Sequence, residues 1–238
     1  MSLKAAVLGL MGDMILSPAR VSNVKRLTER FRLIDLEASG FKSAVRGAGQ
    51  KVEIDVGDGS MRTYTPISID ASTGCLRILT FVNGIGPGSA WAACVKAGNK
   101  VRVVGPRASL RVSTLNESAI LFGDETSFGV AKTLQAQLGN VKTSFVFEVG
   151  SLEEARVALD ELELGCAKLI EKHPDGVHLQ NAALPIKEAM MERKAGELFF
   201  TGCAFSIRRV RAILSASGVD LRRSKVKAYW APGKRGLD

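Results

Sequence analysis

The chain has 238 residues, 46% apolar and 24% charged, a composition that excludes wholesale disorder and is long enough for two domains. Its formal net charge is +9. Residues 1–114 carry 16 Lys and Arg against 8 Asp and Glu, whereas residues 115–238 carry 17 against 16. The positive first half favours an anionic ligand, and charge alone leaves nucleic acid open as an alternative.

The four cysteines are far apart in the sequence and form no Cys-x-x-Cys pair: Cys75, Cys94, Cys166 and Cys203. This spacing argues against a zinc site or a disulfide framework and favours a reducing cytoplasm. The apolar run over residues 5–11 is interrupted by Asp13, so it is too short for a membrane span and a poor signal peptide. We expect a short amphipathic helix over residues 4–16.

The first half has the pattern of an antiparallel β-barrel or sandwich, with short strands separated by turns. Residues 51–56 alternate strictly between charged and apolar side chains, as in a strand with one wet face. We predict strands over residues 31–36, 51–56, 61–69, 75–82 and 100–104. Residues 89–95 are expected to form a helical turn.

The second half alternates strands with helices, which predicts a parallel sheet covered on both faces. The expected strands are residues 118–122, 141–149, 197–201 and 225–230. The expected helices are residues 127–138, a segment opened by the capping box Ser151-x-x-Glu154, and residues 181–195 and 206–217. Residues 165–180 fit no single element. The fold class is therefore a barrel domain, residues 1–114, followed by an α/β domain, residues 115–238.

The segment Arg62-Thr63-Tyr64-Thr65-Pro66 places a cation, an aromatic ring and hydroxyls on adjacent strand positions. In a strand, Arg62 and Tyr64 point to one face and Thr63 and Thr65 to the other. Pro66 leaves Thr65 at a strand end, and the Arg62 fork suits a diphosphate. An ordinary barrel strand with a half-buried tyrosine is the other interpretation.

One hairpin later, Asn83-Gly84-Ile85-Gly86-Pro87-Gly88-Ser89 leads into the helical turn that contains Trp91. Glycines allow tight turns, and backbone amides at a helix start bind phosphate. The loop therefore predicts a phosphate site, with a plain connecting loop as the alternative.

A third candidate, Gly123-Asp124-Glu125-Thr126, directly follows the first strand of the second half, and Thr201-Gly202-Cys203 follows a later strand. Because ligands of open α/β sheets bind at the carboxyl ends of the strands, both segments are predicted to line one crevice. Either segment alone is also compatible with a strand end and a helix cap.

The order of these motifs, together with Gly105-Pro106-Arg107 and Tyr229-Trp230-x-x-Gly233, resembles the siderophore-interacting protein family. These are FAD-dependent ferric-siderophore reductases of the ferredoxin-reductase superfamily. The resemblance runs from about Val21 to Gly233. It implies an FAD-binding barrel followed by a nicotinamide-binding α/β domain.

By resemblance, Arg62 holds the FAD diphosphate, Tyr64 packs on the isoalloxazine and Thr65 lies near flavin N5, so Tyr64 and Thr65 are the implied catalytic residues. The implied FAD-binding residues are Arg62, Thr63, Tyr64, Thr65, Asn83, Gly84, Gly86, Pro87, Gly88, Ser89, Trp91, Thr126, Tyr229 and Trp230. The implied nicotinamide-binding residues are Gly123, Asp124, Glu125, Thr201, Gly202 and Cys203.

The sequence departs from the family pattern at several places. Asn83 stands where the family often has His, and Cys203 stands where a Glu is usual after Gly202. The stretch after Thr126 is Ser127-Phe128-Gly129-Val130 instead of the familiar Ala-Leu-Pro-Ala. Ile67 and Ser68 replace a basic residue, so substrate-binding cations do not transfer.

Other polar residues have simpler interpretations. His173 and His178 flank a turn without a metal-ligand pattern, and we expect no metal site. Glu148, near a strand end, suits a ribose diol and hence NADH, or is a solvated carboxylate. Cys203 either meets the nicotinamide or is a buried structural cysteine.

The sequence therefore predicts a cytoplasmic FAD enzyme, a monomer, that takes hydride from NADH or NADPH and reduces a ferric siderophore or other ferric chelate to release Fe(II) for iron acquisition. It predicts no nucleic-acid partner and no membrane span. One alternative is another reductase of the superfamily that passes electrons to a protein carrier. The other is a non-enzymatic basic module that binds a siderophore or nucleic acid.

Overall fold

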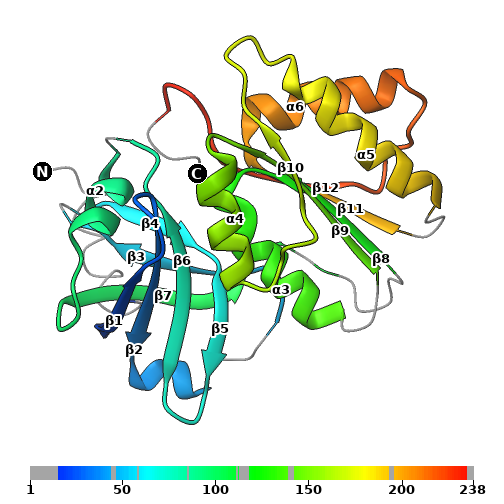
Figure 1. The fold of residues 1–238 in the computed structure, drawn as a ribbon. Helices are drawn as coiled ribbons and strands as arrows, with labels where there is room; N and C mark the ends of the chain where they lie inside the picture. Colours follow the sequence, from blue (N-terminus) through cyan, green and yellow to red (C-terminus); the bar gives the residue numbers. More distant parts are fainter. Residues whose placement is uncertain are drawn as a thin grey trace, which may run out of the picture. The chain divides into compact units, whose positions relative to one another are not determined.

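The structure is a computed structural model that describes residues 16–43, 47–57, 59–84, 86–110, 112, 118–138, 142–192 and 196–234. Nearly all of the helix predicted over residues 4–16 lies outside these ranges. Backbone contacts divide the chain into two compact units (Figure 1). The barrel unit contains residues 1–26 and 30–109, and the sheet unit contains residues 27–29 and 110–238.

The barrel unit is a seven-stranded antiparallel sheet with the strand order β4-β3-β7-β1-β2-β6-β5. Its strands are β1 (Ser17–Arg26), β2 (Phe31–Glu37), β3 (Gln50–Asp55), β4 (Met61–Tyr64), β5 (Pro66–Asp70), β6 (Cys75–Phe81) and β7 (Lys100–Ala108), joined by the 3-10 turn η1 (Ser39–Ser43) and helix α2 (Pro87–Cys94). The end strands also contact the other side of the sheet, β5 with β3 and β4 with β6. The sheet therefore curls into the predicted barrel.

Strand β1 is not among the predicted strands, and two predicted strands differ from the structure by more than two residues. The single strand expected over residues 61–69 is wrong, because the chain breaks at Thr65 into β4 and β5. Pro66 has no amide N–H for the ladder and constrains the residue before it, so the chain leaves one edge of the sheet at Thr65 and enters the other. Strand β7 is longer than the expected residues 100–104 and continues to Ala108.

The barrel core is apolar and follows the alternation read from the sequence. Val52 and Ile54 on β3 are fully buried, whereas Lys51, Glu53 and Asp55, which alternate with them, are not. The other fully buried core residues include Val21, Ile34, Leu36, Leu76, Ile78 and Val103. Tyr64 and Trp91 pack against this core from its margin.

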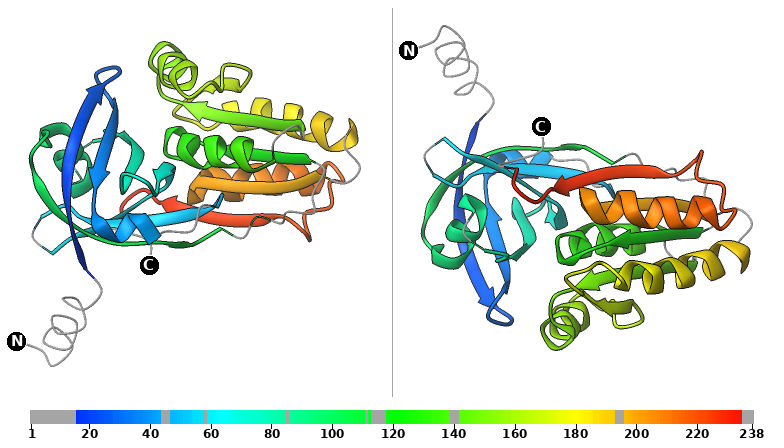
Figure 2. Two further views of the ribbon diagram at one scale, coloured as in Figure 1. Left: turned by 90° about the horizontal axis from the view of Figure 1, so that it is seen from below. Right: turned by 90° about the horizontal axis from the view of Figure 1, so that it is seen from above.

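The sheet unit has five parallel strands in the order β10-β9-β8-β11-β12. They are β8 (Ser118–Gly123), β9 (Lys142–Val149), β10 (Lys168–Glu171), β11 (Gly196–Cys203) and β12 (Lys225–Trp230). Figure 2 gives two further views of the ribbon. The first strand, β8, is central, and the chain adds β9 and β10 on one side before crossing to β11 and β12. This reversal between β8 and β11 is the topological switch point at which such sheets bind ligands.

Helices cover both faces of this sheet. They are α3 (Phe128–Leu138), α4 (Leu152–Glu161), α5 (His178–Glu192) and α6 (Ala204–Ala216), with a 3-10 turn η2 (Glu125–Ser127) before α3. Ile120, Phe122 and Phe200 face α5 and α6 in one apolar cluster. On the other face Phe147 packs on Phe128 of α3, with ring centroids 4.8 Å apart. The predicted fold class, a barrel followed by a covered parallel sheet, is confirmed.

Residues 165–180, which fit no element in the sequence, contain β10, a turn and the start of α5. Helix α5 begins at His178, three residues before the predicted start, and holds Pro185 in its interior. Among the helices of the described residues, none is both long and apolar enough to pass through a membrane.

Candidate functional site

Arg62 and Tyr64 lie on the inner face of the barrel wall. Tyr64 pairs with Val52 and Arg62 pairs with Ile54 across the β3–β4 ladder. Directly paired residues of antiparallel strands point to the same side, and both partners are core residues. Thr63 therefore points outward, and it is exposed.

The glycine-rich loop approaches these two side chains closely. A Cβ atom placed on Gly88 would lie 3.2 Å from both Arg62 Cγ and the Tyr64 hydroxyl oxygen. Only a residue without a side chain allows this approach without a shift of its neighbours. The loop and the strand thus lie against each other at this point, and their joint binding of a ligand stays a prediction.

Helix α2 begins in this loop without a side-chain cap. Gly86 is its N-cap residue, and Pro87 occupies the first turn. Uncapped amide groups at a helix start carry partial positive charge and bind anions. Asn83 and Ser89 brace the loop: the Ser89 hydroxyl donates to Asn83 Oδ1 (2.8 Å) and accepts from the Asn83 amide N–H (3.1 Å).

Arg62 has donors to spare for a ligand. One terminal nitrogen donates to the Met61 carbonyl oxygen at 2.7 Å, and within the described part of the chain Arg62 pairs with no carboxylate. A guanidinium beside an uncapped helix start suits a diphosphate group. The residues present therefore fit the phosphate portion of a dinucleotide such as FAD.

An aromatic pair flanks the same position. The rings of Tyr64 and Trp91 are tilted, with centroids 5.7 Å apart. Burial raises the pKa of Tyr64, against a smaller opposing effect of the Arg62 charge. The phenol thus remains a neutral hydrogen-bonding group, and Thr65 follows it at the break between β4 and β5.

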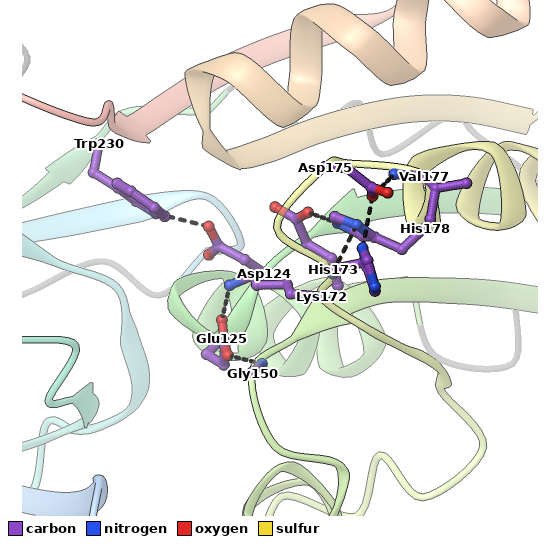
Figure 3. A network of polar contacts seen from close by, with 10 residues as sticks. Asp124, Glu125, Gly150, Lys172, His173, Asp175, Val177, His178 and Trp230 are labelled. Carbon is purple, nitrogen blue, oxygen red and sulfur yellow. Dashed lines mark hydrogen bonds and ion pairs between the residues drawn. The ribbon is translucent and has the colours of Figure 1, made fainter.

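The second group of predicted residues lies at the carboxyl edge of the parallel sheet, where Asp124 follows β8 (Figure 3). Asp124 is the N-cap of η2: its Oδ1 accepts from the Thr126 amide at 2.9 Å and also from the Thr126 hydroxyl. In return Ser127 Oγ accepts from the Asp124 amide at 3.3 Å. This capping box fixes the conformation of the whole motif.

The other Asp124 oxygen, Oδ2, accepts a hydrogen bond from Trp230 Nε1 at 2.7 Å, across 106 sequence positions. Asp124 is 1% exposed. Burial raises the pKa of its carboxyl group, while the positive charge of Lys172 and the hydrogen bonds from Thr126 and Trp230 act in the opposite direction.

Glu125 ties together the ends of three neighbouring strands. Its Oε1 accepts from the Gly150 amide, after β9, and its Oε2 pairs with Lys172 Nζ, after β10, both at 2.6 Å (Figure 3). Burial disfavours the charged form of Lys172, but the charges of Glu125 and Asp124 outweigh it and raise the lysine pKa. No sequence pattern indicates Lys172 or Gly150 as a functional residue.

Neither interpretation of Glu148 holds. The residue is 2% exposed, and its Oε2 lies 2.8 Å from His178 Nε2, so the carboxylate is neither solvated nor available to a ribose. The His173 amide donates to His178 Nδ1 at 3.0 Å. Because Nδ1 accepts, Nε2 carries the proton, and it donates to Glu148.

The remaining predicted residues pack at the same edge. Thr201 Oγ1 donates to Ser127 Oγ at 2.7 Å, so the departure from the family pattern at Ser127 has its own hydrogen-bonding partner. Cys203 is 5% exposed and is the N-cap residue of α6, in agreement with the buried structural interpretation. Gly123 packs against both Ser127 and Thr201.

A curled antiparallel barrel with a glycine loop, followed by a parallel sheet with this strand order, defines the two-domain ferredoxin reductase-like fold. Phthalate dioxygenase reductase, described as a modular structure for electron transfer from pyridine nucleotides to [2Fe-2S], matches with a TM-score of 0.73 and 17% identity. The match covers 94% of this chain and 71% of that one.

Residues 46–110 match the family model of the siderophore-interacting FAD-binding domain. This confirms the predicted resemblance and identifies the barrel unit as an FAD-binding domain, so the chain is a flavoprotein. The fold and the family model together support a flavin oxidoreductase.

Two solved structures of proteins named for siderophore use or interaction also match this chain. A siderophore utilization protein from T. fusca is 24% identical over 94% of this chain and 95% of that one, with a TM-score of 0.68. The siderophore interacting protein of Acinetobacter baumannii is 15% identical over 92% and 91%, with a TM-score of 0.71. At these identities the matches show a shared fold. No curated protein matches the chain in sequence.

Proposed function

We propose that this protein reduces ferric iron held by a siderophore, using FAD and electrons from NADH or NADPH, and thereby releases Fe(II). The observation that carries the proposal is the approach of Gly88 to Arg62 and Tyr64 at the uncapped start of α2. That geometry lies within the segment that matches the siderophore-interacting FAD-binding domain.

We assign the cofactor contacts of the barrel unit as follows. Arg62 and the amides of the loop from Asn83 to Ser89 hold the diphosphate, and Trp91 shapes that pocket. Tyr64 lies against the ring system, and the Thr65 hydroxyl and amide are placed at the strand break to meet its reactive edge. When bound, FAD supplies the redox chemistry by accepting hydride and passing on single electrons.

We assign the nucleotide to the carboxyl edge of the sheet unit. Gly123 and Gly202 bring backbone close to that edge, and Thr201, Asp124 and Glu125 fix its shape. Thr126, Tyr229 and Trp230 are the residues of this unit assigned to the flavin. Cys203 is buried and is assigned no direct chemical role.

The substrate class follows from charge and ligand chemistry. Residues 1–114 carry a formal charge of +8, which raises the local concentration of anionic chelates. Siderophores hold Fe(III) through hard ligands, chiefly oxygen, and Fe(II) binds such ligands more weakly, so reduction frees the metal. In this proposal the protein acts in the cytoplasm on a ferric chelate and needs no resident metal.

One alternative has an observation in its favour. The TM-score to phthalate dioxygenase reductase, 0.73, exceeds the 0.68 found for the T. fusca siderophore utilization protein. The alternative function is electron transfer from the flavin to an acidic iron–sulfur or flavin protein. The two differ in the acceptor that the reduced enzyme prefers.

A visible spectrum of the purified protein is the first experiment, and a flavin band is expected. NADH or NADPH is then added with a ferric siderophore and a ferrous trap, and formation of the coloured Fe(II) complex is followed. A colourless protein that refuses added FAD contradicts the proposal. Faster reduction of a ferredoxin than of any ferric chelate favours the alternative.

A further inference from the structure

The two oxygens of Asp124 have different partners. Oδ1 caps η2 locally through Thr126, whereas Oδ2 accepts the indole N–H of Trp230 from the last residue of β12. Both oxygens are engaged, and the residue is 1% exposed. Because it is buried and each oxygen already accepts a hydrogen bond, the Asp124 carboxylate is not accessible to a nucleotide.

The bond between Asp124 and Trp230 passes over strand β11, because β11 lies between β8 and β12 in the sheet. At the crossing point is Gly202, with φ of +95°, where an added Cβ would lie 2.6 Å from Asp124 Cγ. Any side chain at this position would displace the carboxyl group. The absence of a side chain at Gly202 thus leaves room for the carboxyl group that accepts the indole N–H at the edge of the ring.

Trp230 donates its indole N–H in this contact. It is partly exposed at the last residue of β12, the final strand in the sheet order. The strand pairing shifts between Gly202 and Cys203, so that Trp230 pairs with Cys203 at the bulge. Figure 3 shows the indole reaching from β12 with its N–H directed at the carboxyl group.

We propose that Asp124 is a positioning residue that fixes the plane of the Trp230 ring, the ring that the proposed function assigns to the flavin. The inference rests on the proposed function and deepens it. It replaces the prediction that Asp124 contacts the nicotinamide directly. A planar ring held by one hydrogen bond offers a stacking surface that loses little freedom when a ligand binds.

Asp124→Asn separates the two roles of the carboxyl group. Asparagine caps a helix as well as aspartate, so its single oxygen retains the bond to Thr126. Its amide group is a donor and cannot accept the indole N–H. The substitution therefore removes the Trp230 bond while it preserves size and cap.

The chain has two tryptophans, so the ¹⁵N-labelled full chain should give two indole N–H resonances, which Trp230→Phe assigns. In Asp124→Asn we expect the Trp230 resonance to move upfield and to exchange faster with water, while the Trp91 resonance stays. Asp175→Asn is the matched control, an exposed carboxylate of the same unit, and should move neither. An unmoved Trp230 resonance in Asp124→Asn overturns the proposal.

Steady-state kinetics test whether the Asp124–Trp230 hydrogen bond affects the reaction with the nucleotide. We expect kcat/KM for the nucleotide to fall about tenfold in Asp124→Asn and in Trp230→Phe, the size of one lost hydrogen bond. The double variant should fall no further than the singles. Wild-type kinetics in Trp230→Phe overturn the positioning role even if Asp124→Asn does not fold.

The two proposals fail differently. Absence of flavin or of reductase activity in the wild-type chain contradicts the proposed function, whereas the indole resonances still test the bond. Normal reductase activity with a moved resonance but unchanged kcat/KM leaves the function standing and overturns the role of Asp124.

Discussion

The candidate residues of the two units differ in how far their polar groups are already satisfied. In the barrel unit, Arg62 makes one bond to a neighbouring carbonyl, and the helix start beside it has no side-chain cap. In the sheet unit, Asp124 and Glu125 have all four carboxyl oxygens engaged. Arg62 thus keeps donors for a ligand, whereas Asp124 and Glu125 hold strand ends in place.

The largest expected effect is a loss of stability when the Glu125–Lys172 ion pair of the sheet unit is broken, which tests whether these polar contacts are structural. Lys172→Met removes the cation that pairs with Glu125, whose side chain is 3% exposed. An unpaired buried carboxylate is costly, so we expect the free energy of unfolding to fall by about 3 kcal/mol. Chemical denaturation measures it.

Lys132→Met is the control for that experiment. Lys132 pairs with Glu163, whose side chain is 83% exposed, and pairs of this kind contribute little. We expect no measurable change. If the two variants are equally stable, the buried network does not hold the strand ends together.

Glycine substitutions make the second test. Gly202 has φ of +95° and faces the Asp124 carboxyl group, whereas Gly218 has φ of +81° and open space around its Cβ position. Gly218→Ala should cost about 1 kcal/mol for the left-handed backbone alone. Gly202→Ala should cost about 1–2 kcal/mol more, because the carboxyl group must also move. Equal losses in thermal or chemical unfolding would show that Asp124 yields freely.

The third test addresses the barrel site. Arg62→Ala should weaken FAD binding by about 2 kcal/mol, or some thirtyfold in Kd, which is the size of a charge-assisted hydrogen bond. Because Arg62 pairs with no carboxylate in the described residues, barrel stability should change little. Flavin fluorescence on titration measures Kd, and circular dichroism follows the barrel.

Lys96→Ala is the matched control, since it removes the same charge just beyond the other end of α2. We expect its FAD affinity to match the wild type. Unchanged affinity in Arg62→Ala, or equal losses in both variants, contradicts the assignment of Arg62 to the diphosphate.

The sequence could predict that the two barrel segments meet because they are close together along the chain. Arg62 and Tyr64 are two residues apart on one strand, and Gly88 follows one hairpin later. Strand periodicity places the first two on one face, and the glycine run indicates a close backbone approach. The strand over residues 225–230 was likewise predicted with its observed bounds.

The sheet network could not be predicted, because its bonds join distant positions. Glu125 meets Lys172 across 47 positions, and Glu148 meets His178 across 30. In the sequence, Lys172 and His178 lie in the stretch 165–180, which fits no single element. Only the strand order, which brings the ends of β8, β9 and β10 to one edge, makes them partners.

The smallest expected effect concerns the pH dependence of stability: the contributions of Asp35 in the barrel unit and Asp124 in the sheet unit change with pH in opposite directions. In the barrel, Arg77 binds Asp35 through two bonds of 2.6 and 2.9 Å and, against an opposing effect of burial, lowers the Asp35 pKa below 3.8. The stabilisation of the folded state by ionised Asp35 is therefore present above pH 3.8 and is lost as the pH falls through the lowered pKa. In the sheet unit, burial raises the Asp124 pKa above 3.8, so its contribution is present below pH 3.8 and is lost as the pH rises through the raised value.

Amide hydrogen exchange resolves the two units separately, with β2 as the reporter for the barrel and β8 for the sheet. Relative to the wild type, Asp35→Asn should lose more protection in β2 at pH 7 than at pH 3. Asp124→Asn should show the reverse trend in β8: its protection relative to the wild type should improve as the pH rises, on top of a constant loss from the Trp230 bond. The slope is the test, since a constant loss is expected for any broken contact. If protection changes with pH in the same direction in both variants, the folded sheet unit favours the ionised form of Asp124, and the raised pKa is contradicted.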